Sequence, residues 1–330
     1  MSRQRKVLKI GITSGDPAGI GPEVLLKALK EYCDPSFVPV VIGSAEFFSV
    51  NHKERFTGFA VRSGGSELPD QPGPLFVDIP LETSMPVPGR GTPETGKESL
   101  KYVDAALDLW ESGEIDAMVT GPVSKGLIER SGTPFTGHTE YIAARTGGEP
   151  YMMMYSGDYR VILVTTHIPI AEVAAAVSLE RIERVISAAH ASMSAIDGGR
   201  IRLAVAGLDP HCGDDGAIGA FDRDVTAEAV RRARERGIDI EGPFAADTLF
   251  IASKWARYNA VIAHYHDQGL VPFKQLAFDR GVNVTLGLPI VRTSVDHGTA
   301  FDIAGRNRAG YNSMIEAISL ACRLRAQREN

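Results

Sequence analysis

The sequence lacks the features of several protein classes. Its 330 residues include three cysteines, Cys33, Cys212 and Cys322, and no CxxC spacing. This odd number argues against a disulfide framework and a cysteine zinc site, and it predicts a reducing, cytoplasmic location. No run of about 18 apolar residues is present, so we expect no membrane span. Residues 1–13 also lack the apolar core and cleavage site of a signal peptide.

Basic charge and phosphate-binding glycine loops are scarce as well. The net charge of −6 and the pI near 5.8 argue against a general nucleic-acid-binding protein. A local basic pocket in an acidic protein can still hold an anionic substrate. The glycine-rich stretches GDPAGIG (15–21) and GPVSKG (121–126) match neither GxGxxG nor the P-loop. The residues alone therefore give no Rossmann or P-loop fingerprint.

Short Val/Ile-rich runs alternate with amphipathic helical patterns through most of the chain, whose length suits two domains. The predicted strands are 7–13, 38–42, 75–79, 115–119, 161–166, 201–206, 260–263 and 282–286. The predicted helices are 22–31, 98–111, 178–196, 226–236 and 312–325. Residues 51–74 and 86–96 are rich in glycine, proline and polar residues, which predicts a surface excursion and a loop. The alternation predicts a largely parallel sheet with helical cover.

Three histidines follow the ends of hydrophobic strands: His167, His211 and His266. In open parallel sheets, ligands bind at the carboxyl ends of the strands, so these residues can meet there. Three imidazoles can hold a divalent metal and leave positions open for a substrate. A structural role is the alternative for any lone histidine, and we assign that role to His264 by its deeper position. The repeated placement of the other three favours a metal site.

Residues 258–309 hold an unusual density of polar side chains beside predicted strand ends. Such a cluster indicates a binding site, because buried polar groups are costly unless they have partners. The candidates for binding an anion, some of them outside this stretch, are His138, Thr139, Lys274, Asn283 and Arg292. Arginine can grip a carboxylate or phosphate with two hydrogen bonds, while lysine acts as a point charge. For Lys274 or Arg292 taken alone, a solvated surface charge is the commoner role.

Several motifs together resemble a known family. They are GDPAGIGPE, TGPVSK, GHTEY, TTHIP, AGLDPHCGDDG, HYHDQGLVPFK, GVNVTLGLPIVRTS and DHGTAFDIAG. In this order they resemble the 4-hydroxythreonine-4-phosphate dehydrogenase family of pyridoxal 5′-phosphate biosynthesis. The resemblance covers nearly the whole chain and is weakest over residues 45–75.

The resemblance implies an α/β fold like that of isocitrate and isopropylmalate dehydrogenases, with two α/β domains around a central cleft. The first domain would span 1–125 plus 286–330 and carry the cofactor side. The second would span 126–285 and carry the metal, substrate and dimer side. A homodimer with sites shared between its subunits is implied, as is NAD or NADP binding without a GxGxxG loop.

The resemblance also implies roles for individual residues. His167, His211 and His266 would bind one divalent metal (zinc, magnesium, manganese or cobalt), with the last histidine supplied by the partner subunit. The five anion candidates would contact the substrate. The cofactor contacts would be His297, Gly298, Thr299 and Asp302 in the stretch HGTAFDIAG. Asp247 and Asp267 also lie in family motifs. Each could support a metal ligand or transfer a proton, or it could simply cap a turn.

The implied reaction is oxidation of 4-phosphohydroxy-L-threonine at C3 with decarboxylation to 3-amino-2-oxopropyl phosphate. The same fold and site also suit dehydrogenases for 4-phospho-D-threonate, 4-phospho-D-erythronate or cis-dihydrodiol carboxylates. A hypothesis of another class is a non-catalytic sensor that binds a metal and an anion. The choice between NAD and NADP stays open: Arg306 and Arg308 suit a 2′-phosphate or are simply solvated.

Overall fold

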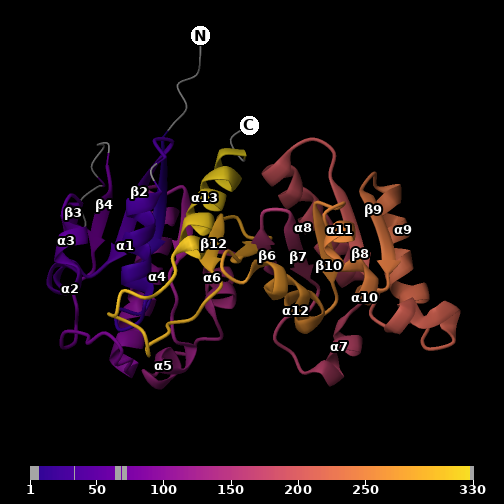
Figure 1. Ribbon diagram of the computed structural model, residues 1–330, viewed down its shortest axis with the longest axis horizontal. Helices are drawn as coiled ribbons and strands as arrows, with labels where there is room; N and C mark the ends of the chain where they lie inside the picture. Colours follow the sequence, from indigo (N-terminus) through magenta and orange to yellow (C-terminus); the bar gives the residue numbers. More distant parts are fainter. Residues whose placement is uncertain (1–6, 33, 64–67, 69–72, 328–330) are drawn as a thin grey trace, which may run out of the picture. The chain divides into compact units, whose positions relative to one another are not determined.

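The computed structural model describes residues 7–32, 34–63, 68 and 73–327 and divides into two compact units. The first unit is Met1–Gly148 with Leu288–Asn330, and the second is Glu149–Gly287 (Figure 1). The sequence placed these boundaries after residues 125 and 285 instead. The two divisions differ mainly over residues 126–148, which the structure groups with the first unit.

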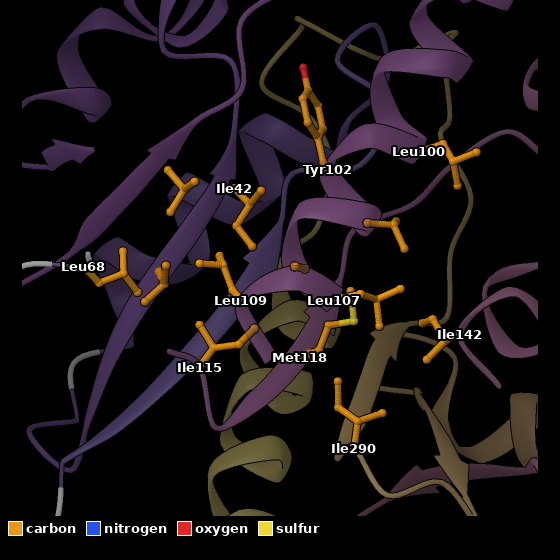
Figure 2. Close-up of a cluster of buried hydrophobic side chains, with 14 of the residues drawn as sticks. Ile42, Leu68, Leu100, Tyr102, Leu107, Leu109, Ile115, Met118, Ile142 and Ile290 are labelled. Carbon is orange, nitrogen blue, oxygen red and sulfur yellow. The ribbon is translucent and has the colours of Figure 1, made fainter. Parts of the chain in front are cut away.

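Helix α6 (His138–Thr146) belongs to the first unit because it is tied to α4 (Pro93–Glu111). The Tyr141 hydroxyl donates to Asp104 Oδ1 over 2.6 Å. The Arg145 guanidinium lies 2.9 Å from Glu111 Oε2. Ile142 is buried in the hydrophobic core that α4 also lines (Figure 2). Short-range packing of this kind could not be seen in the sequence between residues 126 and 148.

The first unit contains a parallel sheet with strand order β3-β4-β2-β1-β5-β12. Its strands are β1 (Leu8–Thr13), β2 (Phe37–Gly43), β3 (Ala60–Ser63), β4 (Leu75–Asp78), β5 (Ala117–Thr120) and β12 (Arg292–Val295). The pairs β1–β2, β1–β5, β2–β4, β3–β4 and β5–β12 are all parallel. Helices α4 and α13 (Asn312–Gln327) pack on the sheet, and α1 (Gly21–Glu31) packs on α13. The predicted α/β class is confirmed.

A buried hydrophobic cluster joins α4 to the sheet of the first unit (Figure 2). Ile42, Leu107 and Met118 are fully buried in it, and Ile290 lies at its lower edge in the figure. Removing such side chains from water stabilises a fold by roughly 1.5–3 kcal/mol each. The hydroxyl of Tyr102 points away from the apolar side chains (Figure 2). The cluster thus fixes α4, and with it α6, against the strands.

Helix α4 begins at Pro93, five residues before the predicted start at residue 98. The Thr92 side chain accepts from Thr95 N over 3.3 Å, and Thr95 Oγ1 accepts from Thr92 N over 3.1 Å. This reciprocal capping box satisfies two amides at the helix start. The prediction of a loop over 86–96 was therefore wrong at its end, because glycine and proline obscured the capping signal.

The predicted surface excursion at 51–74 also contains regular structure. It includes α3 (Lys53–Phe56) and β3, while residues 64–67 and 69–72 lie outside the described residues. The rings of Phe56 and Phe59 lie 4.9 and 6.1 Å from that of Phe76 on β4. Aromatic packing on a neighbouring strand overrides the polar composition. The preceding helix α2 (Ala45–Asn51), capped by Ser44, was not predicted.

The second unit has strand order β11-β6-β7-β10-β8-β9. The strands are β6 (Tyr151–Ser156), β7 (Tyr159–Leu163), β8 (Arg202–Ala206), β9 (Asp239–Phe244), β10 (Ala260–Ala263) and β11 (Val282–Leu286). Strands β7, β10, β8 and β9 are parallel, whereas β6 runs antiparallel to β7 and β11. The sequence predicted a largely parallel sheet, and the tight β6–β7 connection explains the antiparallel exception.

The helices of the second unit are α7 (Ile170–Ala176), α8 (Leu179–Asp197), α9 (Ala227–Glu235), α10 (Ala246–Leu249), α11 (Ala252–Trp255) and α12 (His266–Ala277). Ser178 caps α8 as predicted, accepting from Arg181 N over 3.2 Å. Among the described residues, none of the helices has both the length and the apolar character needed to cross a membrane.

Candidate functional site

Three neighbouring parallel strands of the second unit deliver the three predicted metal-binding histidines. Strand β10 lies between β7 and β8 in the sheet. His167 follows the carboxyl end of β7, His211 that of β8, and His266 opens helix α12 just after β10. The ring centroids of His167 and His266 are 5.6 Å apart. The fold thus brings sequence-distant imidazoles to one edge of one sheet.

The described residues of one chain do not bring together a complete set of metal ligands. Over residues 7–32, 34–63, 68 and 73–327, no group of three or more His, Cys, Asp and Glu side chains is placed to hold a metal ion. His167 and His266 are brought together, whereas His211 stands apart from them. His167 and His211 are exposed and His266 is partly exposed, so these rings are accessible to a further ligand.

His211 lies in an unusual backbone turn. Residues Pro210–Gly216 form a 3-10-type element in which His211 has φ 52° and Cys212 has φ 56°. Asp214 and Asp215 are also left-handed, with φ values of 46° and 52°. Left-handed residues other than glycine cost roughly 1–2 kcal/mol each. Consecutive strained residues are typical of functional sites, where the surrounding structure must hold them in place.

The buried carboxylate of Asp222 supports the chain leading to His211. Its oxygens accept from Leu208 N over 2.9 Å and from Asp209 N over 2.8 Å. The Thr226 hydroxyl donates to the same carboxylate over 2.8 Å. From α12, Gln268 Nε2 donates to the Gly207 carbonyl over 2.7 Å. The strand end of β8 is therefore fixed from two elements, an arrangement that the sequence did not reveal.

His264 has the structural role that the sequence predicted. It is fully buried, and its Nε2 lies 3.3 Å from the Thr226 hydroxyl. His264 and His266 do not lie on one strand. Strand β10 ends at Ala263, and His266 begins a helix.

The two acidic candidates of the second unit differ in position. Asp267 Oδ1 lies 2.7 Å from His266 Nδ1, so this carboxylate contacts a predicted metal ligand directly. Asp247 is exposed in the first turn of α10. Together with burial and the charge of Asp222, the Asp247 charge raises the pKa of the Cys212 thiol. Asp247 thus lies near the turn that carries His211.

In the first unit, three predicted substrate contacts come from two elements. His138 and Thr139 open α6, and Arg292 opens β12. Arg292 is buried and its Nη2 donates to Thr120 Oγ1 over 2.7 Å. Burial lowers the Arg292 pKa to about 10 while the Glu140 charge raises it, so Arg292 stays cationic near neutral pH. The positive charge of Arg292 therefore favours the binding of an anion beside it.

His138 is held uncharged beside that guanidinium. Burial and then the Arg292 charge place the His138 pKa well below its ordinary value. Its Nε2 is buried and has no hydrogen-bond partner among the described residues. An imidazole in this state can donate to or accept from a ligand, and a buried polar atom without a partner is unusual in a folded protein.

The other two predicted substrate contacts lie in the second unit. Lys274 is in α12, eight residues after His266, and Asn283 is in β11. Within the described part of the chain, the buried Asn283 Oδ1 accepts no hydrogen bond. The five anion candidates therefore form one set in each unit, and each set contains a buried polar atom suited to a ligand.

The predicted cofactor contacts lie between β12 and α13. In the part of the chain described, His297 Nε2 is buried and lacks a partner, and burial lowers the His297 pKa. No atom lies within 4 Å of the place where a Cβ on Gly298 would stand. The Thr299 carbonyl accepts from Ile20 N over 2.9 Å, so the stretch GDPAGIG packs against this segment. Its Gly19 is required there, because a Cβ would lie 2.9 Å from the Thr299 oxygen.

The sequence reasoning missed two buried acids in SGDPAGIGPE. Asp16 Oδ1 accepts from Ala18 N over 2.9 Å, and Oδ2 accepts from the Thr95 hydroxyl over 3.2 Å. Burial raises the Asp16 pKa to about 6. The second acid, Glu23, accepts from the segment that follows the cofactor candidates. This stretch matched a family motif, but no role was assigned to either acid.

Known proteins match almost the whole chain. The model of a family described as pyridoxal phosphate biosynthetic protein PdxA matches residues 36–321. A 4-hydroxythreonine-4-phosphate dehydrogenase of Chromobacterium violaceum is 43% identical over 94% of this chain and 95% of its own length. The crystal structure of 4-hydroxythreonine-4-phosphate dehydrogenase from Klebsiella pneumoniae is 34% identical with a TM-score of 0.81, covering 96% and 99% of the two chains.

A related activity is represented among the solved structures as well. A terephthalate 1,2-cis-dihydrodiol dehydrogenase from Burkholderia xenovorans LB400 is 28% identical with a TM-score of 0.69, covering 96% of this chain and 98% of its own. The two 4-hydroxythreonine-4-phosphate dehydrogenases have higher identities to this chain, 43% and 34%, and the family model matches most of it. This chain belongs to the PdxA family.

Proposed function

We propose that the chain is a 4-hydroxythreonine-4-phosphate dehydrogenase. It would oxidise 4-phosphohydroxy-L-threonine at C3, with decarboxylation to 3-amino-2-oxopropyl phosphate, in pyridoxal 5′-phosphate biosynthesis. The observation that carries the proposal is the placement of His167, His211 and His266 at the carboxyl ends of three adjacent parallel strands. The name of the Chromobacterium violaceum relative supports the choice of substrate.

The anion candidates would hold the substrate. Arg292 is buried, cationic and oriented by Thr120, which suits a carboxylate or phosphate. His138, uncharged, and Thr139 would add hydrogen bonds from the start of α6. Lys274 and Asn283 are the other two proposed substrate contacts. Fixing C3 in one orientation can lower the barrier by as much as roughly 7–11 kcal/mol in favourable cases.

The three histidines would hold a divalent cation. Their donor chemistry fits zinc, because neutral imidazoles are good zinc ligands, and cobalt, manganese or magnesium could serve instead. When bound, the cation would polarise the C3 oxygen as a Lewis acid. His167 and His211 follow the carboxyl ends of β7 and β8, on either side of β10 in the sheet. Because one chain gives no complete set among its described residues, we propose that a homodimer completes it, with His266 supplied by the partner subunit.

The segment from His297 to Asp302 would bind NAD or NADP. Gly298 faces open space and His297 has a buried ring nitrogen that accepts or donates nothing within the described residues. Both observations fit a nucleotide lying against this segment. The bound nicotinamide would accept the hydride that leaves C3. The Thr299 main chain is fixed by the bond from Ile20 to its carbonyl.

A second copy of the chain would cover exposed hydrophobic side chains of the second unit. Large hydrophobic side chains are exposed there at Ile168, Ile170, Ile218, Ile251, Val271, Leu276 and Phe278. Phe278 is 74% exposed and Ile170 is 70% exposed. Several of these residues are close in sequence to the three histidines. A homodimer through this unit would bury them and share the metal sites.

A reducing, cytoplasmic location is also part of the proposal. Cys212 and Cys322 are free cysteines in the described part of the chain, and Cys33 lies outside it. Burial raises the Cys322 pKa to about 12, which makes its thiol unreactive. Free thiols persist in a reducing compartment.

The test is reduction of NAD+ and NADP+ by purified protein with 4-phosphohydroxy-L-threonine and, in parallel, 4-phospho-D-threonate. Each assay is run with a chelator and with added zinc or magnesium. We expect metal-dependent turnover that is highest with the first substrate. Preference for 4-phospho-D-threonate or the erythronate would instead assign a sugar-acid branch. No reduction with any alcohol or metal would favour a non-catalytic sensor.

A second candidate is oxidation of a cis-dihydrodiol carboxylate. The solved terephthalate dihydrodiol dehydrogenase favours it by its likeness over nearly the whole chain. Such a substrate has no phosphate, so its binding would not compete with inorganic phosphate. Competition by inorganic phosphate against the substrate would support the first assignment, and its absence together with dihydrodiol turnover would support the second.

A further inference from the structure

The carboxylate of Glu23 is buried in the first turn of α1 and binds three backbone amides of one distant segment. Oε2 accepts from Gly305 N over 3.1 Å and from Asn307 N over 3.4 Å, and Oε1 accepts from Ala309 N over 3.3 Å. The side chain is only 3% exposed. A buried carboxylate is costly unless it is hydrogen-bonded, and these alternate amides supply the bonds. Glu23 therefore holds residues 305–309 in a defined conformation.

Lys27 lies one turn further along α1 and completes the contact. Its Nζ lies 3.6 Å from Glu23 Oε1 and donates to the Ala309 carbonyl over 3.1 Å. The two side chains thus bind both the amide and the carbonyl of Ala309. Just before α1, Ile20 N donates to the Thr299 carbonyl. The beginning of α1 is consequently bonded to both ends of the segment 299–309.

The backbone of the segment 299–309 is left-handed at two positions near its end. Gly305 has φ 74° and Asn307 has φ 57°, both in the left-handed region. A Cβ at Gly305 would stand 2.9 Å from Pro88 Cβ, so the chain approaches its neighbour closely there. Glycine and asparagine are the residues that adopt this conformation most readily, and hydrogen bonds to their amides help to select it. Glu23 provides such bonds to the amides of these two residues and of Ala309.

We propose that Glu23 is a positioning residue for the nucleotide cofactor. By fixing residues 305–309, it keeps the preceding residues His297 to Asp302 in the shape that binds NAD or NADP. The inference rests on the proposed cofactor site. A segment that is ordered before binding loses less conformational entropy when the ligand arrives, which increases affinity. Among the contacts of the described residues, Glu23 bonds to residues 305–309 and to none of the five substrate candidates.

The test is the variant Glu23→Gln, in which one of the two carboxylate oxygens becomes an amide donor that opposes the backbone amides. We expect the Kd for NAD+, measured by titration calorimetry, to rise about tenfold, as for the loss of hydrogen bonds to a charged group. The KM for NAD+ should rise in parallel, while the KM for the phosphorylated substrate stays within about twofold. Hydrogen exchange at the amides of residues 305–309 should accelerate.

Glu31→Gln is the matched control, because Glu31 is an exposed acid at the other end of the same helix. It should change none of these quantities. If Glu23→Gln does not fold, Lys27→Met tests the same contact and should raise the Kd by a smaller factor. An unchanged NAD+ affinity in folded Glu23→Gln, while wild type binds, overturns the inference and leaves the proposed function standing. If wild type itself binds neither NAD+ nor NADP+, the proposed function fails instead.

Discussion

The His266 ring and the Asp267 carboxylate are hydrogen-bonded neighbours, with 2.7 Å between Nδ1 and Oδ1. This contact leaves Nε2 of His266 as the nitrogen available to a metal. Carboxylates that bind the second nitrogen of a metal-bound histidine fix its tautomer and orientation. The geometry therefore favours the supporting role of Asp267 over that of a simple turn cap.

The variant Asp267→Asn should weaken metal binding while leaving the fold intact. We expect zinc affinity, measured by competition with a chromophoric chelator, to fall by about 10- to 100-fold. Asp279→Asn is the matched control, because Asp279 is an exposed aspartate that follows the same helix. Equal zinc affinity in wild type and Asp267→Asn would rule out the supporting role.

Replacing His211 should separate its chemical role from its backbone strain. Both His211→Ala and His211→Gly remove the imidazole, so both should lose most metal-dependent activity. Glycine tolerates the φ of 52° at this position, whereas alanine does not. We therefore expect the glycine variant to be about 1 kcal/mol more stable to urea than the alanine variant. Wild-type turnover in either variant with full metal content would contradict the assignment of His211 as a ligand.

Arg292→Lys should reduce the affinity for the anionic substrate although it keeps the charge. Lysine cannot make the two parallel bonds that a buried guanidinium offers, and it would lose the contact with Thr120. We expect the KM for the phosphorylated substrate to rise by on the order of tenfold or more. The exposed Arg130 provides the control Arg130→Lys, which should behave as wild type. A KM unchanged by Arg292→Lys would remove this residue from the binding site.

Asp16 should make stability depend on pH in a specific direction. Burial raises its pKa from 3.8 to about 6 in the folded protein, so the folded state retains its proton longer than the unfolded state. Its contribution is fully present below about pH 4 and is lost as pH rises through about 6. The difference corresponds to roughly 3 kcal/mol at most.

The variant Asp16→Asn tests this, because an amide can keep the bond from Ala18 but does not ionise. Urea unfolding should show the variant to be more stable relative to wild type at pH 7.5 than at pH 4. The measurement at pH 4 serves as the internal control. A difference between the two proteins that is constant across this range would show that Asp16 does not titrate as expected.

Local patterns in the sequence predicted many of the elements. The apolar runs at β1, β8 and β10 are buried strands, as predicted. An apolar run is buried whichever strand it pairs with, so the sequence is enough to predict it. Ser178 predicted the start of α8 because a cap acts within one turn. The short helix α3 and strand β3 were missed, because contacts with Phe76 stabilise a segment that has a polar composition.

The candidate site divides in the same way. The sequence alone identified which residues have the chemistry for a metal or an anion, since residue type determines charge and donor capacity. The grouping of His167 and His266 depended on the order of strands in the sheet, which no local pattern encodes. The bonds from Glu23 to residues 305–309 span more than 280 positions in the chain. Such contacts form only in the tertiary structure, because polar groups that are buried away from water must form hydrogen bonds within the protein.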